Sequence, residues 1–138
     1  MRLSVDGQVV FLGWVFTKSR DRHAVIDVTC YDQLRYLKAS ASYCFVGRTA
    51  GQIIQEIAQD FQLKVGALDD TGYPIPTLIK EDKSCLDIIS AAIQQTLLAT
   101  GKLYTFFDDA GALCLREAGA MVARGVVGEG SLLLDYTY

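Results

Sequence analysis

The single histidine, His23, limits the acid–base chemistry that this chain of 138 residues can perform. It lies in a polar segment beside Asp21 and Arg22. A general base needs a sheltered position in which its pKa is tuned for proton transfer, and a polar turn does not provide one. We interpret His23 as a solvated turn residue and expect no catalytic Cys–His pair.

Neighbouring carboxylates are the other candidates for catalysis, because cell-wall glycosidases place two Asp or Glu residues on either side of the scissile bond. The pairs are Asp69 with Asp70, Glu81 with Asp82, and Asp108 with Asp109. Turns select Asp for backbone reasons alone, and no apolar segment surrounds the last pair to raise the pKa of one member. The sequence also contains no P-loop, GxGxxG, HExxH or GxSxG motif. We therefore expect no catalytic residue and no enzyme activity.

The cysteines are spread along the chain without the paired spacing of a metal site. They are Cys30, Cys44, Cys85 and Cys114. Free cysteines in apolar surroundings behave as small hydrophobic residues. We expect them to be reduced and structural, and we expect neither a metal nor a cofactor.

Binding is the chemistry that remains. Lys18, Arg20 and Arg22 form a basic cluster that suits a phosphate or an acidic partner, although three charges on a solvated turn confer little by themselves. Aromatic residues in the same region offer either a platform for bases or sugars or packing on a sheet, and we favour sheet packing. These residues are Trp14, Phe16, Tyr31 and Tyr36.

Composition narrows the class of partner. A net charge of −3 argues against a nucleic-acid-binding protein, since such proteins are usually basic. No run reaches the length of a membrane span, and the N-terminus lacks the apolar segment of a secretory signal, so we expect the protein to start in the cytoplasm. The hydrophobic fraction of 51% is high for a small domain and suggests surfaces that a partner covers.

Strands dominate the first part of the chain. We expect a strand at residues 2–5, a tight turn at Asp6 and Gly7, a second strand at residues 8–17, and a third at residues 26–31, where apolar and polar residues alternate. A short helical segment follows, and we expect Leu34 and Leu37 to close over the apolar side of this hairpin.

Two capped helices follow. Thr49 and Gln52 form a capping-box pattern before a helix at residues 50–62. Ser84 caps a second helix that Gly101 ends. Between them lie a turn with two prolines and a short strand at residues 77–80.

A hairpin at residues 102–116 completes this unit, with Gly111 in its turn. The fold class is therefore α+β, with an antiparallel β-rich N-terminal part, a partial barrel-like sheet, followed by a compact unit of two helices and a hairpin. We divide the chain into residues 1–46, 47–118 and 119–138. The last segment is extended, leads to a further β-rich domain, and contains a strand around Leu132, Leu134 and Tyr136. Unpaired strands at 2–5 and 132–138 predict pairing between subunits and suggest a fragment of a longer protein.

Several segments carry a resemblance to a known family. They are GWVFTKSRD through VIDVTCYDQLRYLKA, residues 49–61, residues 70–76 and residues 84–115. In this order they resemble the tail and baseplate-hub proteins of PBSX-like prophages, the XkdQ/YqbQ family. The similarity covers most of the chain and fades after Arg116.

The resemblance implies a structural protein of a contractile tail, a baseplate-hub-like assembly module that joins the tail tube to the spike. It implies other tail proteins as partners, a trimer in the intact protein, and a location in the host cytoplasm during assembly and then in the virion or tail particle. As possible partner contacts we name Lys18, Arg20, Arg22, Leu132, Leu134 and Tyr136. The alternatives are a cell-wall hydrolase, which the poor catalytic supply argues against, and a non-catalytic peptidoglycan-binding module.

Overall fold

A computed structural model describes residues 1–121 of the chain. Its strands and helices are, in order, β1 (Arg2–Val5), β2 (Gln8–Leu12), β3 (Trp14–Arg20), β4 (Ile26–Tyr31), the 3-10 helix η1 (Gln33–Lys38), β5 (Ser40–Arg48), α1 (Ala50–Asp60), β6 (Val65–Leu68), β7 (Ile75–Ser84), α2 (Cys85–Thr100), β8 (Tyr104–Asp108), β9 (Leu113–Glu117) and the 3-10 helix η2 (Ala118–Ala120). The α+β class is confirmed. These residues form no closed barrel.

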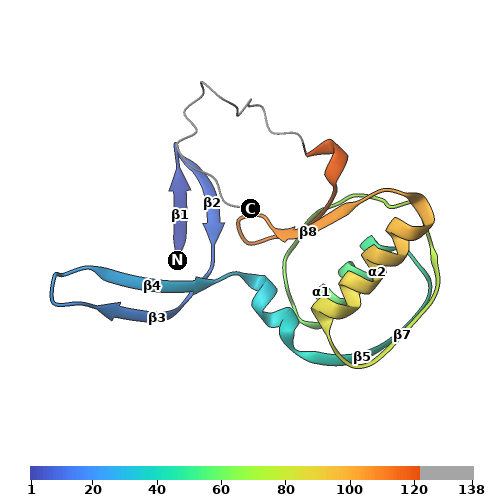
Figure 1. Ribbon diagram of the computed structural model, residues 1–138, viewed down its shortest axis with the longest axis horizontal. Coiled ribbons are helices and arrows are strands. Elements are labelled where there is room, and N and C mark those ends of the chain that lie inside the picture. Colours follow the sequence, from blue (N-terminus) through green and yellow to red (C-terminus); the bar gives the residue numbers. More distant parts are fainter. Residues whose placement is uncertain (122–138) are drawn as a thin grey trace.

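The N-terminal strands form two separate antiparallel hairpins, β1 with β2 and β3 with β4 (Figure 1). The single strand predicted at residues 8–17 is wrong, because Gly13 interrupts it. A Cβ at Gly13 would lie 2.5 Å from the Tyr31 carbonyl oxygen and 2.5 Å from the Phe11 ring, so the close approach there requires glycine. The predicted turn is confirmed, with a positive φ at both Asp6 and Gly7.

After η1, residues 40–121 form the part of the molecule that we call the body. In it β5 pairs with β7, and α1 packs against α2. Figure 1 shows β5 and β7 curving around the two helices. A second sheet has the order β6-β9-β8, with β6 parallel to β9 and β8 antiparallel to it. The predicted strand at 77–80 is part of the longer β7, and β6 was not predicted.

Both helix starts are confirmed. The Thr49 hydroxyl accepts a hydrogen bond from the Gln52 amide at 3.3 Å, and the Gln52 side chain accepts one from the Thr49 amide at 3.0 Å. The Ser84 hydroxyl accepts from the Asp87 amide at 3.1 Å. Gly101 has the expected left-handed conformation, with φ of 69°. The first helix ends at Asp60, two residues before its predicted end.

The core lies entirely in the body and in η1. Leu37 is fully buried in it and Leu34 packs against it, so the prediction that these residues close over the hairpin is wrong. Gln33 explains the difference, because its amide ties η1 to the body. Its Nε2 donates to Asp108 Oδ2 at 2.9 Å, and its Oε1 accepts from the Lys64 amide at 2.9 Å.

The predicted boundary between residues 46 and 47 falls within β5, which pairs with β7 over most of its length. The division of the chain into three domains stays a prediction. The predicted strand at Leu132, Leu134 and Tyr136 lies outside the described residues.

Candidate interaction surface

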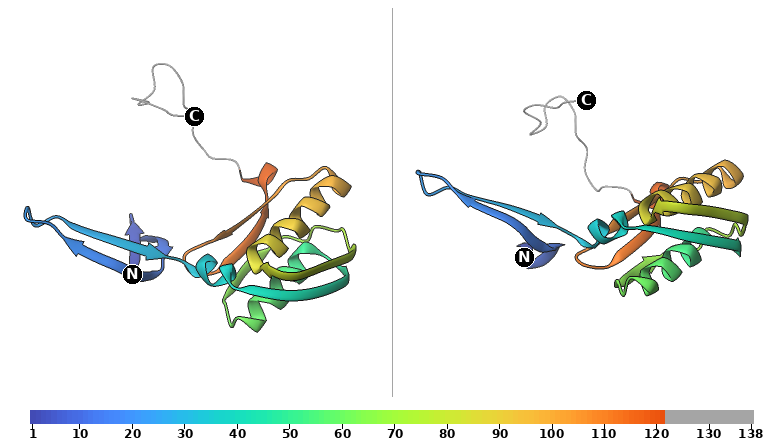
Figure 2. Two further views of the ribbon diagram at one scale, coloured as in Figure 1. Left: turned by 60° about the horizontal axis from the view of Figure 1, so that its bottom comes forward. Right: turned by 90° about the horizontal axis from the view of Figure 1, so that it is seen from below.

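The β3–β4 hairpin, residues 14–31, is the most exposed part of the described chain, and we call it the arm. Every residue of β3 is exposed, and so is every residue of β4 except the half-buried Cys30. The arm nevertheless carries large apolar side chains, among them Trp14 at 52% and Phe16 at 59% exposure. Figures 1 and 2 show it projecting away from the body. An isolated two-stranded hairpin is at best marginally stable in water, so this surface is suited to a partner.

Aromatic contacts hold the base of the arm against η1. The Arg35 guanidinium lies 4.3 Å from the centre of the Phe16 ring and 4.2 Å from that of Tyr31. Trp14 and Tyr36 meet edge to face, with ring centres 5.5 Å apart. Cation–π and edge-to-face contacts each stabilise by about 0.5 to 1 kcal/mol at exposed sites. They fix the direction of the arm without burying its apolar surface.

The far end of the arm, its tip, carries the predicted basic cluster. Lys18 and Arg20 lie on β3 and Arg22 lies in the turn, and all three are exposed. The Asp21 carboxylate closes the turn by accepting from the amides of His23 at 2.8 Å and Val25 at 2.9 Å. His23 is exposed, as a solvated turn residue should be. Of the six predicted contact residues the structure places these three together, and Leu132, Leu134 and Tyr136 lie outside the described residues.

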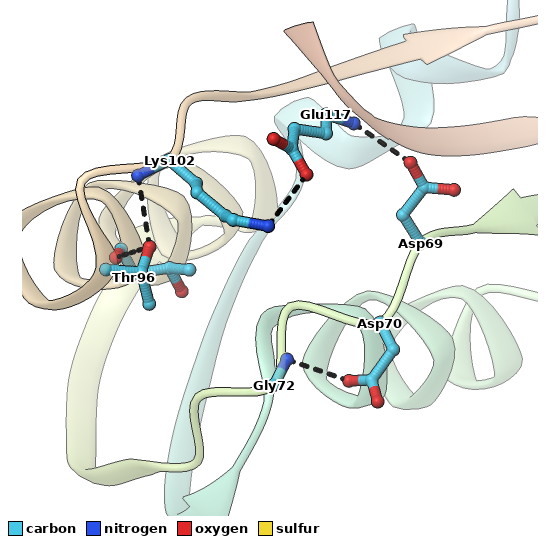
Figure 3. Close-up of polar contacts among 7 residues, drawn as sticks. Asp69, Asp70, Gly72, Thr96, Lys102 and Glu117 are labelled. Atoms are coloured by element: carbon cyan, nitrogen blue, oxygen red, sulfur yellow. Dashed lines mark hydrogen bonds and ion pairs between the residues drawn. The ribbon is translucent and has the colours of Figure 1, made fainter. Parts of the chain in front are cut away.

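Three of the six carboxylates considered for catalysis bind backbone amides. Asp69 accepts from the Glu117 amide at 2.9 Å and Asp70 accepts from the Gly72 amide at 2.9 Å (Figure 3). Asp108 accepts from the Gly111 amide at 2.7 Å with one oxygen and from Gln33 with the other. The bonds of Asp70 to Gly72 and of Asp108 to Gly111 are those that turns require of Asp, whereas Asp69 and Gln33 link segments distant in the sequence.

Few ionisable groups have a shifted pKa. Burial raises the pKa of Asp32, and the negative charge of Asp108 adds to the effect. Burial also raises the pKa of the Cys85 thiol. The pKa of Tyr43 is raised by burial and by its hydrogen bond to Asp60. The hydrogen bond from Lys102 to Glu117 raises the pKa of this lysine. None of these four groups lies on the arm.

A groove on the body was not predicted. It has a volume of about 720 Å³ and runs along the polar side of α1 to the segment after β6. It is lined by Arg48, Thr49, Gly51, Gln52, Gln55, Glu56, Gln59, Leu68, Asp69 and Asp70. The polar side of α1 could be predicted from the sequence. The position of Asp69 and Asp70 beside α1 could not, because it depends on the parallel pairing of β6 with β9, for which neighbouring residues give no signal. We call it the α1 groove.

Within residues 1–121 no three His, Cys, Asp or Glu side chains gather in a way that would hold a metal ion. All four cysteines are free. None of the helices in this part of the chain is long and apolar enough to cross a membrane.

A solved structure shares this fold. The 43 kDa tail protein of prophage MuSo2 from Shewanella oneidensis matches 81% of this chain with a TM-score of 0.59 and 19% sequence identity, and the match covers 35% of that protein. At this identity the similarity shows the fold alone.

Two proteins of Bacillus subtilis (strain 168) are similar in sequence. The phage-like element PBSX protein XkdQ is 39% identical over 112 residues, which are 80% of this chain and 34% of XkdQ. The protein YqbQ is 34% identical over 134 residues, which are 96% of this chain and 41% of YqbQ. The chain thus spans about a third of the length of XkdQ and about two fifths of that of YqbQ. The family model described as YQBQ-like matches residues 1–138. This chain is therefore a member of the YQBQ-like family.

Proposed function

We propose that this chain is a structural component of a phage or prophage tail, and that its arm contacts other tail proteins. The observation that carries the proposal is the arm itself, an apolar hairpin exposed along both strands and held in place at its base. Exposed apolar surface of this kind marks sites of protein–protein contact.

The names of the relatives support a tail function. One belongs to the phage-like element PBSX, and the protein of similar fold is a tail protein. Within the tail we propose a baseplate-hub-like position between tail tube and spike, and a trimer for the intact protein. The protein would then assemble in the cytoplasm of its host and end in the tail particle.

A role without catalysis fits the side chains of the described residues. His23 is exposed on the turn of the arm, and the carboxylates of Asp69, Asp70 and Asp108 bind backbone amides. Catalysis requires a nucleophile or metal, a base and a group that orients the base, held together in a sheltered site. Among residues 1–121 no such set supports the cell-wall hydrolase, and we propose an assembly function instead.

The test is incorporation into tail particles. In a host that produces the complete particle, we would compare the wild-type protein with a Val15→Ser, Val28→Ser variant, which changes exposed apolar residues of the arm and keeps the aromatic contacts at its base. The matched control is Leu98→Ser, which alters an apolar residue of the body that is 80% exposed. We expect the wild-type and control proteins to be detected in purified particles by mass spectrometry. We expect the arm variant to remain soluble, with an unchanged circular dichroism spectrum, and to be lost from the particles.

If the wild-type protein does not copurify with particles, the tail function is wrong. If the arm variant is incorporated as well as the control, the tail function stands but the arm is not its contact surface.

A further inference from the structure

We propose that the arm of one copy docks on the body of a second copy, with its basic tip in the α1 groove. This inference rests on the proposed function and names one partner of the arm. It follows from charge, from the apolar surface beside the groove, and from the direction in which the arm points.

The two surfaces have opposite charge. The tip carries the three cations Lys18, Arg20 and Arg22. Against them stand the carboxylates of Asp21, which closes the turn through Oδ1, and of Asp27, which lies opposite Ser19 on β4. The α1 groove carries Glu56, Asp69 and Asp70 against the single cation Arg48. Complementary charges of this kind steer two proteins together and fix the register of the contact.

The groove has free acceptors for the tip. The hydrogen bonds of Asp69 and Asp70 use one carboxylate oxygen each, Oδ2 and Oδ1 respectively, and within residues 1–121 the other oxygen of each has no donor (Figure 3). Glu56 and Gln55 are exposed and make no hydrogen bond to another side chain of the described part of the chain. Arginine recognises such carboxylates well, because its guanidinium donates two parallel hydrogen bonds.

The apolar part of the arm also has a counterpart. On β5, Val46 lies two residues before the groove residue Arg48 and is 67% exposed. On β7, Ile79 is 59% exposed and pairs with Cys44. Because side chains alternate along a strand, Cys44, Val46 and Ile79 share the outer face of this sheet. The basic tip thus matches the acidic α1 groove, and the apolar residues of the rest of the arm match the apolar outer face of β5 and β7.

The direction of the arm requires a second copy. In all three views of Figures 1 and 2 the arm leaves the molecule on the side away from α1. The base of the arm is fixed by Trp14, Phe16 and Arg35, so the tip does not turn back to its own groove. A contact between two different surfaces of the same chain is heterologous, and copies joined in this way form a ring when the rotation closes.

The test is charge exchange, measured by sedimentation velocity over a series of concentrations. The tip variant is Arg20→Glu, Arg22→Glu, and the groove variant is Gln55→Lys, Glu56→Lys. The groove substitutions lie on the exposed side of α1 and remove no hydrogen bond that stabilises the body. The third variant combines all four substitutions. The matched control is Glu81→Lys, Lys83→Glu, which exchanges exposed charges on β7 outside the groove.

We expect the wild-type protein and the control to associate equally, and each reversal to weaken association by about tenfold or more, because it places like charges together. The combined variant should recover most of the wild-type association. Raising the salt concentration from about 0.05 M to about 0.5 M should weaken wild-type association. A wild-type protein that remains monomeric at every concentration, or reversals that change nothing, would overturn the arm-to-groove contact.

The arm-to-groove contact and the tail function can fail independently of each other. Incorporation of wild-type protein into particles without any effect of the charge reversals would leave the tail function in place and exclude this contact. Rescue by the combined variant, with no protein in particles, would establish the contact and exclude the tail function.

Discussion

Asp32 caps η1 at an electrostatic cost. Its Oδ1 accepts from the Leu34 amide at 3.0 Å, while burial and the charge of Asp108 raise its pKa. Folding raises the pKa of this acid. At pH values between its pKa in the unfolded protein and its pKa in the folded protein, the folded state therefore binds more protons than the unfolded state does. The free energy of unfolding therefore decreases as pH rises through that interval.

The variant Asp32→Asn should stabilise the protein at neutral pH. Asparagine keeps the capping oxygen and removes the charge. We expect a higher melting temperature at pH 7 and no gain below pH 3.8, the ordinary pKa of the group, where Asp32 is itself neutral. Circular dichroism melts at both pH values measure this. The control is Asp109→Asn, an exposed change that should have little effect, and a gain in Asp32→Asn that persists at low pH would contradict the electrostatic explanation.

Gln33 is the buried polar residue that joins η1 to the body. It is 4% exposed and bonds to Asp108 and to the Lys64 amide. Gln33→Leu should lower the free energy of unfolding by about 2 to 3 kcal/mol, because it leaves two polar groups without partners. Urea unfolding measures the change. Gln94→Leu, on the exposed side of α2, is the control, and equal stability of the two variants would exclude a structural role for the Gln33 bonds.

At the scale of elements, the helices depend on signals within a few residues of sequence. Thr49→Ala removes the hydroxyl of the capping box, and we expect a loss of about 1 kcal/mol in the free energy of unfolding. Chemical denaturation measures it, with Gln55→Ala on the exposed side of the same helix as the control. If Thr49→Ala behaved like the control, the capping bonds would contribute nothing to the stability of α1.

This locality explains which elements the sequence predicted. Both helices, the tight turn at Asp6 and Gly7 and the β8–β9 hairpin are specified by neighbouring residues, and all were predicted. The pairing of β5 with β7 and of β6 with β9 joins residues at least 27 positions apart, from Arg48 with Ile75 upward, and no local pattern encodes it. The same limit applies to the interaction surfaces. The basic residues of the tip are visible in the sequence, whereas the α1 groove exists only after β6 brings Asp69 beside the helix.

At the scale of the whole molecule, the hydrophobic core stabilises the body but not the N-terminal hairpins. The core cluster and the residues packed against it begin at Leu34, so β1 to β4 contribute nothing to it. The N-terminal hairpins contact the rest of the chain at few points, one being Leu12. A Cβ at Gly111 would lie 2.6 Å from its Cδ2.

A chain that begins at Asp32 should therefore still fold. We expect cooperative thermal unfolding with a melting temperature within about 5 °C of that of the full chain, since the core is unchanged. Calorimetry measures it. Non-cooperative unfolding would show that the N-terminal hairpins stabilise the body.

The link between arm and body also sets how the molecule bears tension. A pull on the arm enters the body through η1 and reaches β5 at Ser40, the first residue of its ladder with β7. Force applied at the end of a ladder opens its bonds one after another, as a zipper opens, and offers little resistance. Gln33 precedes Ser40 in the chain, and its side chain is hydrogen-bonded to Asp108 of β8 and to the Lys64 amide. These two bonds are therefore loaded before the end of the β5–β7 ladder. Gln33 is thus the first point of mechanical resistance, and the strength of the joint under load depends on its two hydrogen bonds.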